Sequence, residues 1–442
     1  MTRRVLMATL SASALLSALL VATTTTTGGA LEAGDTIVVD TTDDGDDADL
    51  GDDECATASG ACTLRAALYT AQAIHEDGVT TVIEVPAGEY VLDEDLYLYN
   101  ANVVVRGAGA GQTIVRATDS RHLTLNRDGE LIVTLEDMTF TGGVANVQDP
   151  LGGSIYSNAG TVTVRRMHFE DNSAGWSGGA IASLGDLFPN TLVVEDSTFV
   201  ANTAALNGGA IMASRGENVT IRNSTFTGNA AAFGGAVSAG DPESPGGANV
   251  TILHATFAGN TASGFQGGDA AGGALFAEPD GSITLTSSIV EDSTEGPVML
   301  VPVAIGDPVP NCGTADGGTI TSGGGNVVDD ASCSTDQPTD QPDTAANVGE
   351  LADNGGPTFT MALTADSPAV DAAGATCSLA TDQRGEARPQ DGDGDGTTGC
   401  DSGAFELAGA AEEPTTTTTT TPPEPTSPPA AQPVRQTPSY TG

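Results

Sequence analysis

The sequence predicts an all-β fold in which the chain winds into a stacked β-helix, or solenoid. The main observation is a phrase that recurs between about Leu131 and Thr286: an alternating strand, S/T-x-F, Asn three residues after the Phe, and G-G-A-I or a close variant. Successive Phe positions are 29, 30, 27 and 31 residues apart, and periods of roughly 20–50 residues are typical of stacked units. The chain also has 57 Gly and only 4% aromatic residues, which favours tight turns over an aromatic-rich core.

The recurring positions are as follows. The Phe residues are Phe140, Phe169, Phe199, Phe226 and Phe257; the Asn residues are Asn172, Asn202, Asn229 and Asn260; the Gly-Gly pairs begin at Gly152, Gly178, Gly208, Gly234 and Gly272. We expect the Asn side chains to form an amide ladder from rung to rung inside a corner. Gly-Gly is expected where the backbone turns with positive φ or passes close to another rung.

One repeat explains why neighbouring units must stack. Period-2 geometry points Val219 and Ile221 inward and Arg222 outward. Asn223 then begins a corner, after which Phe226 faces inward again. A single repeat cannot bury this apolar face, so its neighbours must lie against it. The same inward pair recurs as Val133/Leu135, Val162/Val164, Leu192/Val194, Val250/Ile252 and Ile283/Leu285.

The outward position before each corner alternates in charge. Successive repeats place there Glu136, Arg165, Glu195 and Arg222. In a parallel stack these side chains are neighbours, so we expect a solvated salt-bridge ladder that favours the correct rung order. The next position along the chain carries Asp137, Arg166, Asp196, Asn223 and His254.

The N-terminal part is expected to contain an export signal and a cap. The pair Arg3-Arg4 precedes an apolar run and then small residues, the pattern of a secretory signal peptide. Residues 35–40 alternate as a first strand, and residues 62–71 have the spacing of a short helix. Since an open solenoid end exposes strand edges and core, this helix is expected to cover the first rung. The first coils are expected at residues 81–85, 90–92, 102–107 and 112–115.

Six cysteines form three close pairs along the chain. In an exported protein, an even number of locally paired Cys is typical of disulfides. Zinc is the alternative, but no Cys-x-x-Cys occurs and the four His are scattered. We therefore predict the disulfides Cys55–Cys62, Cys312–Cys333 and Cys377–Cys400.

Two parts of the sequence resemble a known group of secreted proteins. Residues 62–67, C-T-L-R-A-A, follow an acidic stretch and a first Cys and resemble the CSLREA motif, with Ala66 where that family has Glu. The repeats are similar to those of polymorphic outer-membrane and other β-helix surface proteins. Four later phrases resemble the closing segment of the same secreted families; they begin at Asn354, Ser367, Thr381 and Asp401.

This resemblance covers most of residues 35–406. It implies a right-handed parallel β-helix with a short N-terminal helical cap and disulfide-stapled ends, but it implies little about activity. The predicted organisation is a signal peptide (1–30), an acidic segment and cap (31–78), β-helix repeats (79–335), a closing segment (336–408) and a disordered Thr/Pro-rich stalk (409–442). Residues 312–333 are expected to enclose an irregular last coil with a strand at 325–328.

The charge of the chain limits its partners. There are 59 acidic residues against 14 basic ones, all Arg, so the formal net charge is −45 at pH 7. A field of this sign repels nucleic acid and anionic lipid. We expect a secreted monomer, without a nucleic-acid partner or a membrane span beyond the signal peptide, whose stalk holds the domain away from a cell wall.

Calcium is the cofactor that the sequence indicates. Asp391, Asp393 and Asp395 alternate with Gly in the D-x-D-x-D-G pattern that begins a calcium loop. Position 12 of such a loop would be Ser402 instead of a bidentate Glu, so a solvated acidic loop is the alternative. The acidic cluster between Asp43 and Asp53 is a weaker candidate of the same kind.

Two classes of function fit these features. The first is a non-catalytic adhesin or surface-display protein that binds an extracellular polysaccharide or another surface. The alternative is a polysaccharide lyase or glycoside hydrolase of the pectate-lyase-like β-helix type. A lyase would use Arg165 or Arg166 as base beside Asp137, Asp196 and Glu195; a hydrolase would use the pair Glu136 and Glu195.

The first class is favoured because the repeat is nearly uniform and aromatic residues that could stack on sugars are scarce. No catalytic residue is therefore predicted, and no G-x-S-x-G motif occurs. Binding is expected in the loops that interrupt the period, at residues 184–190, 241–247 and 263–271.

Overall fold

The computed structural model describes residues 30–126, 131–146, 148–158, 160–185, 190–241, 246–264, 272–295 and 309–409. All of these residues belong to one compact unit, Met1–Gly409. The predicted signal peptide and stalk lie outside the described residues, apart from Ala30 and Gly409. Most of the three variable loops also lies outside them, namely residues 186–189, 242–245 and 265–271.

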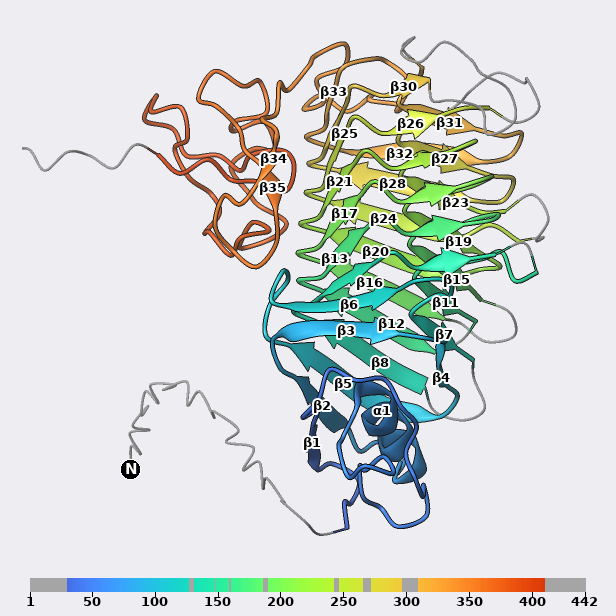
Figure 1. Ribbon diagram of the computed structural model, residues 1–442. Coiled ribbons are helices and arrows are strands. Elements are labelled where there is room, and N and C mark those ends of the chain that lie inside the picture. Colours follow the sequence, from blue (N-terminus) through green and yellow to red (C-terminus); the bar gives the residue numbers. More distant parts are fainter. Residues whose placement is uncertain are drawn as a thin grey trace, which may run out of the picture. The chain divides into compact units, whose positions relative to one another are not determined.

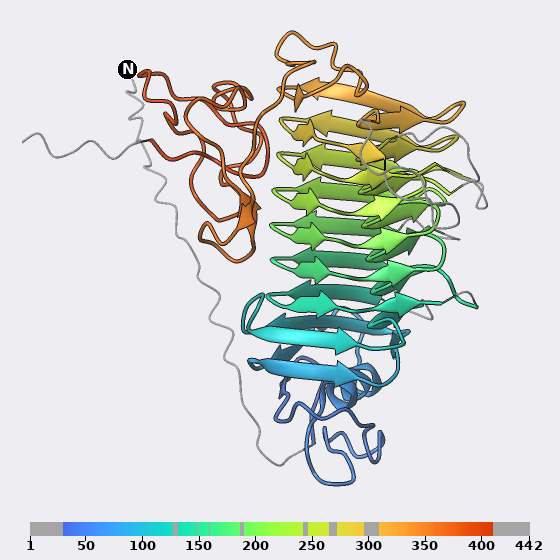
Figure 2. The ribbon, with the colours of Figure 1, turned by 45° about the horizontal axis from the view of Figure 1, so that its top comes forward.

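The chain forms a right-handed parallel β-helix, which confirms the predicted fold class (Figures 1 and 2). In one coil it passes through four sheets, using β12 (Thr161–Arg165), β13 (His168–Glu170), β14 (Ser173–Ala174) and β15 (Ile181–Leu184). The next strand, β16 (Thr191–Glu195), pairs in parallel with β12. Each sheet therefore gains strands coil by coil, in the order of the chain.

The four sheets of the β-helix differ in their number of strands. The ten-stranded sheet contains β1 (Thr36–Val38), β2 (Thr81–Val85), β5 (Ala101–Gly107), β8 (Leu131–Glu136), β12, β16, β20 (Asn218–Arg222), β24 (Asn249–Leu253), β28 (Ser282–Thr286) and β32 (Thr319–Gly324). The nine-stranded sheet contains β3 (Gly88–Leu92), β6 (Thr113–Ala117), β9 (Thr139–Thr141), β13, β17 (Thr198–Val200), β21 (Thr225–Thr227), β25 (Thr256–Ala258), β29 (Ile289–Glu291) and β33 (Val327–Val328).

The other two sheets have eight and six strands. The eight-stranded sheet contains β4 (Leu96–Leu98), β7 (Leu123–Leu125), β11 (Ile155–Ser157), β15, β19 (Ile211–Ser214), β23 (Val237–Ala239), β27 (Leu275–Ala277) and β31 (Cys312–Thr314). The six-stranded sheet contains β10 (Val144–Ala145), β14, β18 (Thr203–Ala204), β22 (Ala230–Ala231), β26 (Thr261–Ala262) and β30 (Thr294–Glu295). Outside the coils, β34 (Leu351–Ala352) and β35 (Thr360–Met361) form an antiparallel pair.

The core consists of the side chains that alternation placed inward. Val219 and Ile221 are buried, and Ile221 lies in register with Val194 and Ile252 on the neighbouring strands. The recurring Phe residues stack through the centre: ring centroids from Phe169 to Phe257 are 4.8, 4.7 and 4.8 Å apart in succession. Each stacked pair adds about 0.5–1.5 kcal/mol beyond the area that it buries.

The predicted amide ladder is present. Each Asn donates through Nδ2 to Oδ1 of the Asn on the next coil, at 2.9 Å from Asn172 to Asn202, 3.0 Å from Asn202 to Asn229 and 3.0 Å from Asn229 to Asn260. The same Nδ2 of Asn202 also donates to the backbone oxygen of Phe169. All four amides are buried, so the ladder satisfies polar groups that could not reach water.

The two glycines of each pair have different roles. The first turns the chain through positive φ, which is +64° at Gly208. The second allows close stacking, since a Cβ at Gly209 would lie 2.1 Å from the carbonyl oxygen of Gly235. Both predicted reasons for glycine therefore hold, one at each position.

A single left-handed residue forms the corner between the ten-stranded and nine-stranded sheets. The residues with positive φ at this place are Asp137, Arg166, Asp196, Asn223, His254 and Ser287. Asn223, at φ +45°, is the residue at which the sequence predicted a corner. Because non-glycine residues rarely adopt this conformation, six of them at equivalent corners indicate that the stack over-determines it.

The N-terminal helix caps the first coils, as predicted. Helix α1 (Leu64–Ala73) begins after Thr63, whose Oγ1 accepts a hydrogen bond from the Ala66 N–H. Leu64, Ala67 and Leu68 are part of the main core. The Cys55–Cys62 disulfide immediately precedes the helix, and the other two predicted disulfides, Cys312–Cys333 and Cys377–Cys400, are also formed.

The expectation of an irregular last coil was largely wrong. β31, β32 and β33 continue three of the sheets, and only one register shift interrupts β32. Cys312 takes the inward position of Leu275, and a buried disulfide fills that space as an aliphatic residue would. The strand expected at 325–328 is limited to Val327–Val328, because Gly324 and Gly325 have positive φ.

The closing segment, residues 336–408, lies along the nine-stranded sheet. Its contacts use the Thr residues that directly precede the recurring Phe, at positions 198, 225 and 256, which we call the Thr column. Thr198 Oγ1 donates to the Phe359 carbonyl oxygen at 2.7 Å, Thr225 Oγ1 donates to Gln383 Oε1 at 2.7 Å, and Thr256 Oγ1 accepts from Ala404 N at 2.9 Å. The segment therefore covers one side of several coils instead of simply following the last one.

Candidate functional site

The alternating charges occupy one column of the ten-stranded sheet, as predicted. Glu136, Arg165, Glu195 and Arg222 are in register on successive strands. Arg165 and Arg106 bind the two oxygens of Glu136, the latter at 2.6 Å, and Arg222 lies 2.7 Å from Glu195. Arg166 binds the Asp137 carboxylate through Nε and Nη2, at 2.7 and 2.6 Å.

This column is less solvated than the sequence suggested. The Glu136 side chain is 0% exposed, because three arginine side chains surround it. Burial by itself would raise the pKa of Glu136, but hydrogen bonds from Arg165 and Arg106 outweigh burial and lower it. The expected solvated ladder is thus wrong at Glu136 and holds for the exposed arginines.

Through these contacts, the candidate catalytic residues form ion pairs with one another. Arg165 and Arg166, the candidate bases, each bind a carboxylate, and Arg165 lies between Glu136 and Glu195 in the column. Asp196 is also held in place, since its backbone oxygen accepts a hydrogen bond from Thr358 Oγ1. Burial is the main reason that the pKa of its side chain rises to about 6. The column can hold the coils in order, because its charged groups pair from one coil to the next.

The acidic loop brings its three carboxylates together. One oxygen from each of Asp391, Asp393 and Asp395 lies within 4.8 Å of the other two. Asp391 Oδ1 is buried and has no hydrogen-bond partner among the described residues. Burial, followed by the charge of Asp393, raises the pKa of nearby Asp371. These oxygens are of the kind that calcium prefers.

The N-terminal acidic cluster has a different role. Arg65 of α1 forms a bidentate pair with Asp44, at 2.7 Å for both bonds. It also donates to the backbone oxygens of Glu94 and Asp95. Thr70 Oγ1 donates to Asp47 Oδ2 at 2.6 Å. The cluster thus binds the helical cap to the first coils. These hydrogen bonds explain the positions of the Asp44 and Asp47 carboxylates without a bound cation.

An aromatic cluster lies on the outer face of the eight-stranded sheet. It consists of Tyr97, Tyr99 and Tyr156. The rings of Tyr97 and Tyr99 stack at 6.4 Å between centroids, and these residues are 38% and 43% exposed. Tyr97 and Tyr156 both align with Thr124, so they lie two strands apart in one column.

Charged groups surround the aromatic cluster. Arg121 is 5.5 Å from the Tyr156 ring centroid, and its Nη1 lies 2.7 Å from Asp149 Oδ2. Asp95 Oδ2 accepts a hydrogen bond from Thr124 Oγ1. A flat aromatic surface beside fixed carboxylate acceptors can bind a ligand that has both an apolar face and hydroxyl groups.

A second concave feature, which we call the notch, lies where the closing segment meets β13. It is a cavity of about 200 Å³. Its lining includes Ile114, Thr139, His168, Glu170, Asp353 and Phe359. The His168 and Phe359 rings meet edge-on at 5.4 Å between centroids. Phe359 is 42% exposed, so part of the ring remains accessible beside the cavity.

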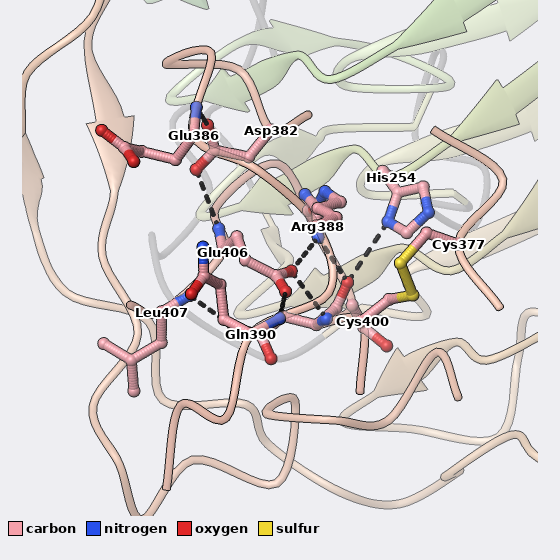
Figure 3. A network of polar contacts seen from close by, with 12 residues as sticks. His254, Cys377, Asp382, Glu386, Arg388, Gln390, Cys400, Glu406 and Leu407 are labelled. Carbon is pink, nitrogen blue, oxygen red and sulfur yellow. Dashed lines mark hydrogen bonds and ion pairs between the residues drawn. A yellow bond between two sulfur atoms is a disulfide. The ribbon is translucent and has the colours of Figure 1, made fainter. Parts of the chain in front are cut away.

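The closing segment contains a buried ion pair (Figure 3). Arg388 Nη1 lies 2.6 Å from Glu406 Oε2, and both side chains are 0% exposed. Arg388 also donates to the backbone oxygens of Asp401 and Gly403. Glu406 accepts from the N–H groups of Asp401 and Gln390. Burial raises the pKa of Glu406, an effect that the Arg388 charge opposes.

This network joins the closing segment to the coils. His254, which follows β24, approaches the Asp401 backbone oxygen through Nδ1 at 3.2 Å. Burial, above all, lowers the pKa of His254 to about 3, so the ring is neutral at physiological pH. The Cys377–Cys400 disulfide holds the chain next to Asp401. Opposite charges that are enclosed together and also bind backbone groups indicate a structural centre.

Sequence reasoning missed the aromatic cluster and the notch. His168 could have been noticed, because the residue directly before the recurring Phe is Thr on the two neighbouring coils and His only here. The alignment of Tyr97 with Tyr156 needed the register of the first, irregular coils, which the repeat does not define. Asp353 and Phe359 come from the closing segment, whose lateral position was not predicted.

No family model, no curated protein and no solved structure matches this chain significantly. The resemblance to CSLREA-motif surface proteins therefore stays a prediction. Among the residues that the structure describes, no helix has the length and apolar character needed to cross a membrane.

Proposed function

We propose that the protein is a secreted or cell-surface β-helix protein that binds an extracellular polysaccharide without modifying it. The observation that carries this proposal is the aromatic cluster on the eight-stranded sheet. Tyr97 and Tyr99 present exposed rings in a chain with few aromatic residues. Aromatic rings pack on the apolar faces of sugars, and the carboxylates of Asp95 and Asp149 supply acceptors for hydroxyl groups.

Further observations support an extracellular location, the charge class of the ligand and binding without catalysis. Three disulfides are typical of a protein outside the reducing cytosol. The formal charge of −45 repels polyanionic glycans, so a neutral or cationic polysaccharide is the favoured ligand. Ion pairing of Arg165 and Arg166 favours binding over the alternative of a lyase or hydrolase.

We expect the double variant Tyr97→Ala/Tyr99→Ala to bind its polysaccharide about tenfold more weakly. Each aromatic contact contributes about 0.5–1.5 kcal/mol, and about 1.4 kcal/mol corresponds to a factor of ten. The ligand would first be found on a glycan array, and its affinity measured by calorimetry. Ile132→Ala, which shortens an exposed apolar side chain on the ten-stranded sheet, is the matched control.

Two results would contradict this proposal. One is the absence of binding to every neutral or cationic glycan on the array. The other is catalysis: unsaturated product released from uronate polymers would identify a lyase, and new reducing ends from neutral polymers would identify a hydrolase. Equal loss of affinity in the Ile132→Ala control would place the ligand elsewhere.

We also propose that Asp391, Asp393 and Asp395 bind calcium. Extracellular calcium modules have dissociation constants of roughly 0.1–1 mM. Addition of about 10 mM calcium should then raise the free energy of unfolding by about 1–3 kcal/mol. Thermal unfolding with calcium, magnesium or chelator would measure this, and Asp393→Asn/Asp395→Asn should abolish the calcium effect. An unchanged melting temperature, or an equal shift in the variant, would refute the site.

A further inference from the structure

The notch has a largely apolar lining in which the polar side chains are mainly hydrogen-bond acceptors. Glu170 and Asp353 contribute carboxylates, and the Glu170 side chain is 47% exposed. Asp353 Oδ1 accepts one hydrogen bond, from the Gly355 N–H. Thr139 Oγ1 already accepts from Gly111 N, at 3.0 Å. A ligand that fits this lining must therefore supply donors, and the two carboxylates favour a positive charge on it.

His168 adds a buried polar atom to the same lining. The residue is only 6% exposed, and its Nδ1 has no hydrogen-bond partner among the described residues. Its Nε2 lies 3.6 Å from Glu170 Oε2. Burial lowers the pKa of the imidazole, although Glu170 opposes this shift, so the ring is neutral. A neutral imidazole has one acceptor nitrogen, so the ring adds no positive charge that would compete with a cationic ligand beside the carboxylates.

We propose that the notch binds the primary ammonium group of an amino-sugar residue in a polysaccharide. The ammonium supplies three donors and a positive charge, which suit a lining that contains the carboxylates of Glu170 and Asp353 beside the neutral His168 ring. The inference rests on the proposed function, since it assigns a second subsite and a charge class to the same polysaccharide ligand.

An amino sugar fits the surroundings of the notch better than a lysine side chain does. The exposed part of Phe359 offers an apolar surface beside the acceptors, on which the C–H face of a sugar ring can pack. The cavity of about 200 Å³ is smaller than the roughly 300–1,000 Å³ of pockets for drug-sized ligands. It therefore suits one ring of a chain whose remainder stays outside.

The test compares two oligosaccharides with the same backbone, one with a primary ammonium group on each ring and the other with a neutral N-acetyl group in its place. Calorimetry on the full chain would use a glucosamine oligomer and the matched N-acetylglucosamine oligomer. We expect the glucosamine oligomer to bind at least about tenfold more tightly, as is typical of a charge-assisted hydrogen bond. Glu170→Gln should remove most of this preference, and His168→Thr should weaken it. Thr is the residue at this position on β9 and β17, so the fold should be kept.

The control is Asp366→Asn, which neutralises an exposed carboxylate of the closing segment outside the notch. It should bind both oligomers as the unchanged protein does. Equal affinity for the two oligomers, or an unchanged preference in Glu170→Gln, would overturn the inference. So would a lysine-containing peptide of equal charge that bound as tightly as the glucosamine oligomer.

The same variants and binding measurements distinguish a failure of this inference from a failure of the proposed function. If a neutral polysaccharide still binds and the Tyr97→Ala/Tyr99→Ala variant weakens it, only the amino-sugar subsite fails. If no polysaccharide binds at all, the proposed function fails as well. Unchanged thermal unfolding of each variant would show that lost binding does not come from misfolding.

Discussion

Replacing Arg388 with Met is expected to lower the free energy of unfolding by about 3–5 kcal/mol. The substitution leaves the Glu406 carboxylate buried without its cation, since both side chains are fully enclosed. It also removes the donors to the backbone oxygens of Asp401 and Gly403. Urea unfolding would measure the change, and limited proteolysis would show whether the closing segment becomes susceptible first.

The control for this variant is Arg116→Met. Arg116 pairs with Glu89 on the surface, where both side chains are about half exposed, and such pairs contribute about 0–1 kcal/mol. The double variant Arg388→Met/Glu406→Leu should recover part of the loss, because no unpaired charge then stays buried. A loss below about 1 kcal/mol for Arg388→Met would show that the pair does not hold the segment.

Gly209→Ala is expected to cost more than about 3 kcal/mol, above the usual range for overpacking. The added methyl group would meet the carbonyl oxygen of Gly235 at 2.1 Å and the backbone of Ala230 at 2.5 Å. Both obstacles are backbone atoms of the next coil, so they cannot rotate away. Loss of parallel stacking should be visible as reduced β signal in circular dichroism and a lower melting temperature.

A matched control for Gly209 is Gly51→Ala in the N-terminal segment. The nearest obstacle there is a side-chain oxygen of Asp49 at 3.3 Å, and the backbone is not in the left-handed region. This change should alter stability by less than about 1 kcal/mol. If Gly209→Ala were as mild as Gly51→Ala, close approach between coils would not be the reason for the second glycine.

The repeat made much of the fold predictable. Phe199 and its neighbours recur at one position of a periodic phrase, so stacking the phrase aligns them without further information. The same holds for the ladder of Asn202 and for the inward pair Val219 and Ile221. Burial of Glu136 could not be predicted, because Arg106 comes from an irregular early coil and converges on it only after folding.

The candidate sites were less predictable than the fold. Asp391, Asp393 and Asp395 were found because their ligand pattern is local in sequence, and the structure brings the three carboxylates together. The notch depends on contacts between distant segments: Thr198, whose Oγ1 donates to the Phe359 carbonyl oxygen beside it, lies 161 residues from Phe359 in the sequence. No periodicity relates two such positions.

The periodic phrase alone was enough to predict the β-helix class, the inward faces, the asparagine ladder and the glycine turns. Each of these follows from local geometry repeated at a constant period, so it needs no knowledge of long-range contacts. The helical cap was predicted from the apolar spacing of residues 62–71, and right-handedness was implied by the resemblance to secreted β-helix proteins. Only the tertiary structure decided that the closing segment covers the Thr column of the nine-stranded sheet. It also decided where Arg388 and Glu406 are enclosed and which side chains line the notch, because those contacts join segments whose encounter depends on the folded surface.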